Sequence, residues 1–409
     1  MTITSEKFSF TGTDGQHLAA RLERPRGRAH AVALFAHCFT CTKDIFAASR
    51  IAGGLAARGI AVLRFDFTGL GHSEGEFANT NFSSNVDDLV VAADHLRSAY
   101  EAPKIVIGHS LGGAAILAAA GRIPEAVAVA TIGAPAEPAH VEHLFQAARP
   151  EIEARGEAEV LLAGRPFTIK KQFLEDIAAT RLEAAIAGLR KALLVFHAPR
   201  DATVGIENAG RIFAAAKHPK SFVSLDDADH LLSRHEDAAY VAEVLAAWAG
   251  RYLGRTDEEP LKAAPGTVVV QETGEGKFTQ RIAAGGHRLR ADEPESFGGD
   301  DSGPGPYDLV LAGLGACTSM TLRLYAERKG WPMSRVTVTL SHEKIHAEDC
   351  ADCETRSGGL DRIERRLSIE GELDDEQRAR LVEIANKCPV HRTLESEVVV
   401  ATSLDDRAA

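Results

Sequence analysis

The chain has 409 residues, of which 45% are hydrophobic and 25% are charged, so disordered and collagen-like proteins are excluded. A chain of this length is expected to form two or three domains rather than one. The formal net charge of −12, without a run of Lys or Arg, argues against a nucleic-acid partner.

The sequence contains no apolar run as long as the roughly 18 uncharged residues that a transmembrane helix needs. The N-terminus also lacks a basic region followed by an apolar stretch, so we expect no secretory signal and no membrane span. These features predict a cytoplasmic protein. Stable disulfides are rare in the cytoplasm, and we therefore expect the six cysteines to be mostly reduced or catalytic.

Strand-like apolar runs alternate with helical patterns between residue 31 and about residue 252. The runs span residues 31–36, 60–65, 105–108, 127–132, 192–197 and 221–225. Their uninterrupted apolar character is typical of strands buried on both faces, so we predict a mostly parallel sheet. Helices such as 111–122 and 238–248 would cover both of its faces. Residues 137–190 break the alternation with a helical, charged stretch, which we interpret as a small cap over the sheet edge.

A polar stretch with two Pro and two Gly, residues 254–266, predicts a linker between a first domain (1–253) and a second (267–409). After the linker the pattern changes to a mixture of helices and hairpin strands, which predicts an α+β domain. The predicted elements are a hairpin of 267–272 and 277–282, a helix over 308–329, strands over 335–340 and 362–370, a helix over 374–387 and a strand over 396–401.

The sharpest motif is Gly-His-Ser-Leu-Gly, in which Ser110 stands between a predicted strand and a predicted helix. That context is a nucleophile elbow, where a strained turn exposes the serine hydroxyl. A catalytic acid and then a histidine should follow at strand ends, and Asp201 and His230 occupy such positions. A neutral imidazole would take the serine proton, and the carboxylate would fix its tautomer.

Three other carboxylates compete with Asp201 for the acid role: Asp226, Asp227 and Asp229. They share one loop with His230, so we prefer Asp201. Two backbone N–H groups should form an oxyanion hole, one from Leu111 after the nucleophile and one from the loop after strand 31–36, at Phe39.

Residues 31–43 and 65–73, together with the elbow, Asp201 and His230, resemble the α/β-hydrolase family over roughly residues 10–252. The resemblance implies the α/β-hydrolase fold and cleavage of an ester, thioester or amide through an acyl-serine. Many members have His-Gly where this chain has His-Cys38, with Cys41 three residues on. We interpret both cysteines as small side chains that fill a crowded loop, with a redox pair as the alternative.

Two further cysteines, Cys317 and Cys388, stand alone in the second domain and could be ordinary core residues. However, residues 305–317 and 388–390 resemble the OsmC/Ohr family of organic hydroperoxide reductases, over about 267–403. The resemblance implies a peroxidase without haem, metal or other cofactor, in which Cys317 is peroxidatic and Cys388 is resolving. An external dithiol, for example of lipoyl type, would reduce the resulting disulfide.

The same resemblance implies an intertwined homodimer that forms through this domain. One position departs from the family, because Tyr307 stands where well-studied members place a Glu that pairs with an Arg. Arg281, Arg288 and Arg290 are available as that cation, and the sequence does not choose among them.

The segment with His342, His346, Cys350 and Cys353 offers four possible zinc ligands. Its spacing is irregular beside known zinc modules, so a metal site, an accessory redox pair and a capped loop stay open, and we assign no metal.

Taken together, these features predict a bifunctional enzyme that is both a serine esterase or thioesterase and a thiol-dependent organic hydroperoxide reductase. Its substrates would be small acyl esters and organic hydroperoxides. The alternative is an esterase, or a perhydrolase, whose OsmC-like domain serves only for dimerisation or ligand binding.

Overall fold

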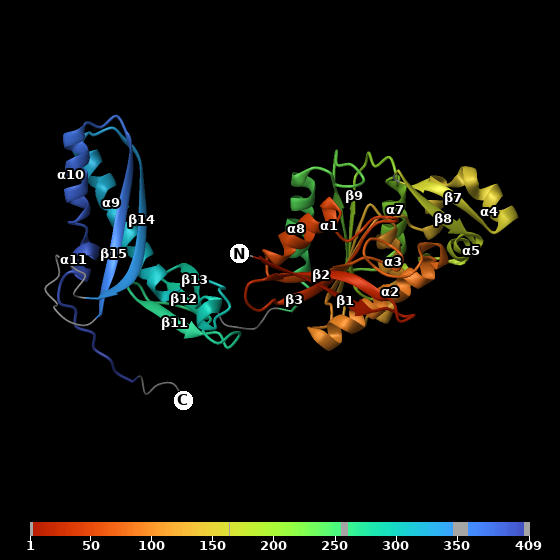
Figure 1. Ribbon diagram of the computed structural model, residues 1–409, viewed down its shortest axis with the longest axis horizontal. Coiled ribbons are helices and arrows are strands. Elements are labelled where there is room, and N and C mark those ends of the chain that lie inside the picture. The colour runs from red at the N-terminus through yellow and green to blue at the C-terminus, as the bar shows by residue number, and fades with distance from the viewer. Residues whose placement is uncertain (1–2, 163, 255–260, 347–358, 405–409) are drawn as a thin grey trace. The chain divides into compact units, whose positions relative to one another are not determined.

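The computed structural model describes residues 3–162, 164–254, 261–346 and 359–404. The chain divides into two compact units, Met1–Leu261 and Lys262–Ala409 (Figure 1). The division falls inside the predicted linker, 254–266. Each unit has a hydrophobic core of its own.

The first unit is built on an eight-stranded sheet with the order β1-β2-β4-β3-β5-β6-β9-β10. From β4 onward all neighbouring strands are parallel, which confirms the predicted sheet. Five of these strands are buried along their whole length, as their unbroken apolar runs require. The six predicted strands are β3 (Ala31–Ala36), β4 (Ile60–Phe65), β5 (Ile105–His109), β6 (Ala128–Ile132), β9 (Ala192–His197) and β10 (Lys220–Ser224).

The sheet also has two antiparallel strands at its N-terminal edge that the sequence analysis missed. They are β1 (Ile3–Thr11) and β2 (His17–Pro25), and β2 pairs antiparallel with β4. Most β1 side chains are at least partly exposed, since β1 is the edge strand and carries polar and charged residues. A strand of this kind lacks the long apolar run that marked the six buried ones.

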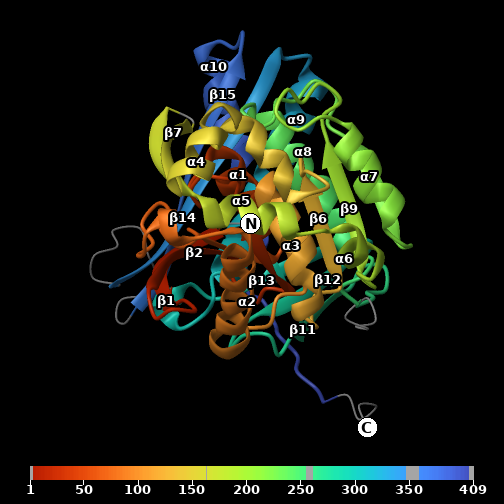
Figure 2. The ribbon, with the colours of Figure 1, turned by 90° about the vertical axis from the view of Figure 1, so that its right-hand side faces the viewer.

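Helices cover both faces of this sheet (Figures 1 and 2). Buried residues of two helices form a core with one face of the sheet. Buried residues of three other helices belong to the core on the opposite face. The predicted helix 111–122 is α3 followed by a 3-10 turn, and 238–248 lies within α8. The first pair is α1 (Phe46–Ala56) and α8 (His235–Ala249), and the set on the other face is α2 (Phe82–Ala99), α3 (Leu111–Ala119) and α7 (Glu207–Ala215).

The cap region between β6 and β9 was predicted to be helical, and this prediction is wrong in part. The region contains a β-hairpin of β7 (Glu157–Leu162) and β8 (Arg165–Lys170). In β7 buried and exposed residues alternate strictly, with Ala158, Val160 and Leu162 inside, which is a strand period rather than a helical one. The other cap elements are short helices: η3 (Pro138–Leu144), η4 (Gln146–Ala148), α4 (Arg149–Arg155), α5 (Lys171–Ala179) and α6 (Glu183–Ala187).

The second unit combines a three-stranded antiparallel sheet with a long hairpin against which helix α9 packs. Its small core joins Leu322 and Ala326 of α9 to Leu381 and Ala385 of α10. The structure adds β13 and α11 to the predicted elements. In chain order the elements are β11 (Val268–Glu272), β12 (Gln280–Ala284), β13 (His287–Ala291), α9 (Pro306–Lys329), β14 (Met333–His346), β15 (Gly359–Gly371), α10 (Asp375–Ala385) and α11 (Pro389–Leu394).

The strand predicted over 396–401 is wrong, since residues 397–404 have no regular secondary structure in the described chain. A strand needs a hydrogen-bonding neighbour, and Val398, Val399 and Val400 are instead 58%, 85% and 83% exposed. The apolar run alone therefore gave a misleading signal.

Helix α9 is the one described helix that is long and apolar enough to cross a membrane, judged by length and composition only. Core helices of soluble proteins meet the same criterion, and α9 packs against β14 and α10 of its own unit. The expected absence of a membrane span stays a prediction.

Candidate active sites

Ser110 lies at a sharp turn between the end of β5 and the start of α3. Its backbone has φ 55° and ψ −127°, a conformation that non-glycine residues rarely adopt. The turn brings α3 very close to the loop after β3, because a Cβ at Gly112 would stand 2.3 Å from the carbonyl oxygen of His37. The motif therefore needs glycine at this position, and the strained turn presents the serine hydroxyl at the strand end.

The structure brings Ser110 together with the two residues predicted as its partners. His230 Nε2 lies 3.0 Å from Ser110 Oγ, and His230 Nδ1 lies 2.7 Å from Asp201 Oδ2. These distances form a continuous hydrogen-bonded chain from hydroxyl to imidazole to carboxylate. Such a chain can remove the proton from a serine that attacks a carbonyl carbon.

Asp201, rather than its rivals, is the carboxylate that meets the imidazole. Its other oxygen accepts hydrogen bonds from the amides of Thr203 and Val204, at 2.8 Å and 2.9 Å. Burial acts to raise the pKa of Asp201, but the hydrogen bonds from His230 and Val204 outweigh it and the pKa is lowered. The carboxylate is therefore charged at neutral pH. The rivals are bonded elsewhere: Asp226 to Ser224, Asp227 to Arg234 and Asp229 to Ser233.

Two further buried histidines, His109 and His197, hold the backbone around this chain of hydrogen bonds. His109 Nε2 donates to the carbonyl oxygen of His230 at 2.7 Å, and His197 Nε2 donates to the carbonyl oxygen of Val204 at 2.7 Å. Burial, and then the charge of a protonated His230, lowers the pKa of His109 to about 4. His109 thus stays neutral and holds the His230 loop without adding charge beside it.

The predicted oxyanion donors lie on the two segments that Gly112 brings into contact. Phe39 belongs to the loop after β3, and Leu111 is the first residue of α3. Among the described residues, neither backbone amide has a hydrogen-bond acceptor of its own. Both N–H groups are thus available to a ligand, and their role in the oxyanion hole stays a prediction.

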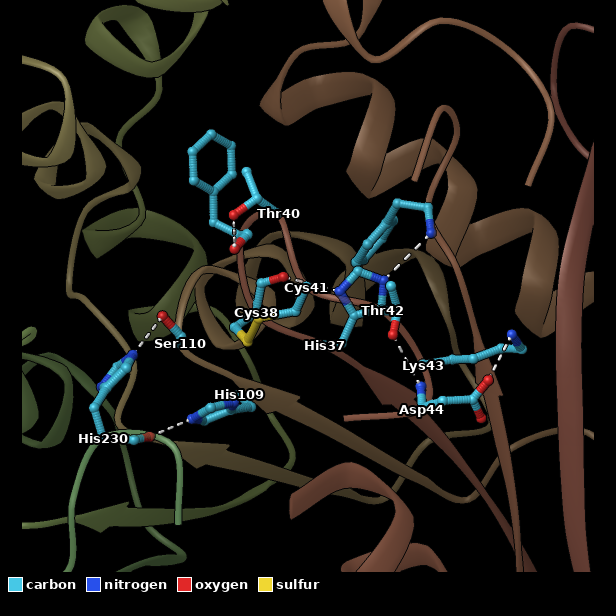
Figure 3. Close-up of a disulfide and its surroundings, with 12 residues drawn as sticks. His37, Cys38, Thr40, Cys41, Thr42, Lys43, Asp44, His109, Ser110 and His230 are labelled. Carbon is cyan, nitrogen blue, oxygen red and sulfur yellow. Dashed lines mark hydrogen bonds and ion pairs between the residues drawn. A yellow bond between two sulfur atoms is a disulfide. The ribbon is translucent and has the colours of Figure 1, made fainter. Parts of the chain in front are cut away.

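The loop after β3 also overturns one interpretation of the sequence, because Cys38 and Cys41 form a disulfide with an S–S distance of 2.00 Å (Figure 3). They are not two reduced side chains that fill space. The local turn brings them together: the amide of Cys41 donates to the carbonyl oxygen of Cys38 at 3.1 Å. The Cys-X-X-Cys spacing was the signal that pointed to this bond.

An open, mostly apolar cavity of about 280 Å³ lies above Ser110 and His230. Its wall includes Val141 and Leu144 of η3 and Leu162 of β7, so the cap forms much of its lining. A cavity near the lower end of the range for small-molecule sites fits a small or medium acyl group rather than a large one.

In the second unit, the structure brings the two lone cysteines together. Cys317 lies within α9 and is partly exposed, whereas Cys388 is buried at the N-cap of α11. Burial acts to raise the pKa of Cys388, but hydrogen bonds from the His391 amide and from the side chains of Thr318 and Cys317 outweigh it. The pKa of Cys388 is therefore lowered, which favours its thiolate.

The cation beside this pair is Arg365 of β15, which the sequence analysis did not single out. Its guanidinium donates to Thr318 Oγ1 at 2.9 Å, and Thr318 Oγ1 in turn lies 3.6 Å from Cys388 Sγ. The charge of Arg365 also lowers the pKa of Cys388. In β15 every second residue is partly buried, and Arg365 is the charged residue in that set, beside Ile363 and Leu367. The alternation of the strand could therefore have shown from the sequence that Arg365 faces inward.

The three arginines considered from sequence are bonded within the β11–β13 region instead. Arg281 donates to Gln271, Arg288 to the carbonyl oxygen of Gly285 and Arg290 to Glu275. Tyr307, at the departing family position, stacks on His342 with ring centroids 4.1 Å apart.

Of the four possible zinc ligands, His342 bonds Asp361 at 2.8 Å. Cys350, Cys353 and the side chain of His346 lie outside what the structure describes. Within the described ranges, no group of three or more His, Cys, Asp or Glu side chains is placed to hold a metal ion.

Comparison with known families agrees with this two-part organisation. The model of the alpha/beta hydrolase family matches residues 33–295, which is more than half of the chain. The chain belongs to the alpha/beta hydrolase family. A second family model, that of OsmC-like proteins, matches residues 299–403 of this alpha/beta hydrolase. Both predicted resemblances are thereby confirmed.

Solved structures similar to this alpha/beta hydrolase cover about three fifths of its chain. An esterase domain of a Rhodothermus marinus protein is 54% identical, with a TM-score of 0.52, and the match covers 62% of this chain and all of that one. Mouse alpha/beta hydrolase domain-containing protein 10 is 20% identical, with a TM-score of 0.52, and the match covers 60% of this chain and 99% of that one; it shows the fold alone.

Among curated proteins, the uncharacterized protein YfhR of Salmonella typhi is 23% identical to this alpha/beta hydrolase over 235 residues. The match covers 56% of this chain and 75% of that protein.

The backbone of Gly133 passes close to the Asp201–His230 pair, a contact that the motifs did not reveal. It follows β6 with φ +55°, and a Cβ there would stand 3.3 Å from Asp201 Oδ2 and 3.4 Å from His230 Nδ1. We expect Gly133→Ala to press the carboxylate and the imidazole apart and to lower kcat for ester hydrolysis about 10-fold or more, with little change in KM. Steady-state kinetics on a p-nitrophenyl ester would measure the effect.

Gly121→Ala is the matched control, because a Cβ at Gly121 meets no atom within 4 Å and this glycine lies in an exposed 3-10 turn. It should leave kcat unchanged. Equal kcat values for the Gly133→Ala and Gly121→Ala proteins would contradict the positioning role of Gly133.

Proposed function

We propose that the first unit is a serine esterase or thioesterase that acts through an acyl-serine intermediate. Ser110 would be the nucleophile, His230 the general base and Asp201 the acid that orients the imidazole. The observation that carries this proposal is the hydrogen-bonded chain of these three side chains at the floor of an apolar cavity. The 54% identity to a solved esterase domain supports it.

The reaction begins when Ser110 Oγ attacks the ester carbonyl carbon and His230 Nε2 takes the hydroxyl proton. Charged Asp201 stabilises the imidazolium that forms, and the amides of Phe39 and Leu111 bind the oxyanion of the tetrahedral intermediate. The imidazolium then protonates the leaving alcohol or thiol. Water, activated by the same imidazole, attacks the acyl-serine and releases the acid.

The test of this proposal is hydrolysis of a series of p-nitrophenyl esters from acetate to decanoate. We expect the highest kcat/KM for short and medium acyl chains, given the size of the cavity. Rapid acid quenching followed by mass spectrometry should locate the acyl group on Ser110. An active protein whose acyl group maps to another residue would contradict the proposed mechanism.

We further propose that the second unit reduces organic hydroperoxides. The thiolate of Cys317, the more exposed of the pair, would attack the O–O bond, which gives a sulfenic acid and releases the alcohol. Cys388 would then attack the sulfenic sulfur, which forms a disulfide and releases water. The lowered pKa of Cys388 supports this second role, because the attacking species is a thiolate.

No resident cofactor takes part in this proposed cycle. An external dithiol, for example of lipoyl type, would reduce the Cys317–Cys388 disulfide and return both thiols. We propose a cytoplasmic location, where such dithiols are kept reduced.

We also propose that the chain forms a homodimer through its second unit. A single copy leaves large apolar side chains of α9 exposed, with Met320 and Leu324 66% and 63% exposed. Val268 and Val270 of β11 are 63% and 56% exposed. Exposed apolar surface of this extent on a small unit favours burial against a second copy.

We expect sedimentation velocity of the full chain to give a species of twice the 43.7 kDa chain mass at micromolar concentration. Met320→Glu together with Leu324→Glu should convert it to a monomer. A wild-type protein that sediments as a monomer across this range would contradict the dimer.

A further inference from the structure

The Cys38–Cys41 disulfide closes a ring of four residues immediately beside the hydrolase site (Figure 3). Both cysteines line the same cavity as Ser110 and His230. Cys38 is buried, with 4% of its surface exposed, whereas Cys41 is partly exposed. A reductant that enters the cavity would therefore reach the sulfur of Cys41 first.

The ring encloses Phe39, whose amide is one of the two proposed oxyanion donors. Next to it, Thr40 has φ +59°, a left-handed conformation that residues with a side chain rarely adopt. Noncovalent contacts also hold this loop: the Phe39 ring stacks on Phe173 of the cap at 5.5 Å, and Arg165 of β8 donates to the carbonyl oxygen of Thr40. The disulfide is the covalent restraint among them.

We propose that the Cys38–Cys41 disulfide is a thiol–disulfide exchange site that a dithiol opens, and that opening it lowers the turnover of the hydrolase site. This inference rests on the esterase proposed above. One thiolate of the dithiol attacks Cys41 Sγ, which forms a mixed disulfide and releases Cys38 as a thiolate. The second thiol of the reductant then displaces Cys41, so the protein gains two electrons and two protons and the dithiol becomes a disulfide.

Opening the disulfide should lower kcat because the four-residue ring restrains the Phe39 amide. Without the bond, the left-handed conformation at Thr40 loses its covalent restraint, and the amide of Phe39 can turn away from the oxyanion position. A donor that acts only on the transition state changes kcat rather than KM when it is lost. Loss of one such donor typically lowers kcat by about 100-fold or more.

The proposed peroxidase activity would link the state of the Cys38–Cys41 disulfide to the supply of hydroperoxide. Reduction of a hydroperoxide at Cys317 and Cys388 would consume the same class of reductant that opens Cys38–Cys41. While peroxide is plentiful, the dithiol is drawn away, the disulfide stays closed and ester cleavage continues. In the cytoplasm proposed for this chain, disulfides that do form are usually catalytic or redox-sensing ones.

The experiment measures kcat and KM of the full chain for p-nitrophenyl acetate before and after incubation with millimolar dithiothreitol under argon. Aliquots are alkylated with iodoacetamide, and peptide mapping by mass spectrometry assigns label to Cys38 and Cys41 separately from Cys317 and Cys388. We expect kcat to fall about 100-fold as Cys38 and Cys41 become labelled, with KM within about threefold. Oxidised dithiothreitol should restore kcat.

Cys38→Ser combined with Cys41→Ser is the companion variant, and its kcat should match that of the reduced wild type and not respond to dithiothreitol. Circular dichroism and a thermal unfolding curve show whether this variant is folded, and the wild-type titration does not depend on it. Two results overturn the inference: Cys38 and Cys41 stay unlabelled in folded protein, or they are fully labelled while kcat is unchanged. A wild type whose Cys38 and Cys41 are unlabelled before any dithiol is added, and which still shows no ester hydrolysis, instead contradicts the esterase itself.

Discussion

Ser110→Ala should reduce kcat for ester hydrolysis by about 10⁴-fold to 10⁶-fold and leave KM close to the wild-type value. The reason is that Ser110 Oγ, 3.0 Å from His230 Nε2, is the nucleophile that would carry the acyl group in the proposed mechanism. Binding in the apolar cavity does not need the hydroxyl, so substrate affinity should survive. Steady-state and single-turnover kinetics with p-nitrophenyl esters would measure both quantities.

Ser98→Ala is a suitable control, because Ser98 is exposed on α2 and its hydroxyl, among the residues that the structure describes, bonds only the carbonyl oxygen of His95. It should retain full activity. A Ser110→Ala protein that keeps more than a tenth of wild-type turnover would rule out the acyl-serine mechanism. Formation of a peracid from acetate and hydrogen peroxide by the wild type, lost in Ser110→Ala, would instead identify a perhydrolase that uses the same serine.

Cys317→Ser should abolish the dithiol-dependent reduction of alkyl hydroperoxides, because serine cannot attack the O–O bond at neutral pH. Cys388→Ser should behave differently and allow a single turnover that stops at the Cys317 sulfenic acid. Dimedone traps sulfenic acids, so mass spectrometry should find its adduct on Cys317 in the Cys388→Ser protein. Consumption of cumene hydroperoxide with dihydrolipoate would measure the steady-state rates.

Ester hydrolysis by the same samples reports whether the hydrolase unit is intact. If Cys317→Ser reduces peroxides as fast as the wild type, the peroxidase proposal fails. The OsmC-like unit would then serve for dimerisation or ligand binding only. A Cys388→Ser protein that turns over repeatedly would show that the dithiol attacks the sulfenic acid directly and that Cys388 is not needed as a resolving thiol.

Much of the hydrolase fold could be predicted because its buried strands carry unbroken apolar runs. Residues 31–36, 60–65 and 192–197 were predicted with the same bounds that the structure shows. Strand β1 was missed because an edge strand is partly exposed and its polar residues hide the signal. Strand β2 was missed because charged residues such as Arg21, Glu23 and Arg24 interrupt its apolar run. The cap hairpin was missed because its two short strands lie among helices, and residues 137–190 were interpreted as one helical, charged segment.

The partners of Ser110 could be predicted because chain order and strand ends restrict the choices to a few residues. Gly133 could not be found in this way, since its role depends on how close a backbone passes to Asp201 and His230. Arg365 was missed for a different reason: its distance in sequence from Cys388 says nothing about a contact that α9, β15 and α11 create together. The strand expected at 396–401 failed because an apolar run has no meaning as a strand without a neighbour.

The stacking of Phe39 on Phe173 ties the cap to the chemistry below it. Phe173 belongs to α5, a cap helix, whereas Phe39 sits on the loop that would polarise the substrate carbonyl. Replacing this cap with that of another hydrolase, in order to change the preferred acyl chain, would therefore also lower the rate of ester cleavage. A graft that retains an aromatic ring facing Phe39 stands the best chance of separating selectivity from rate.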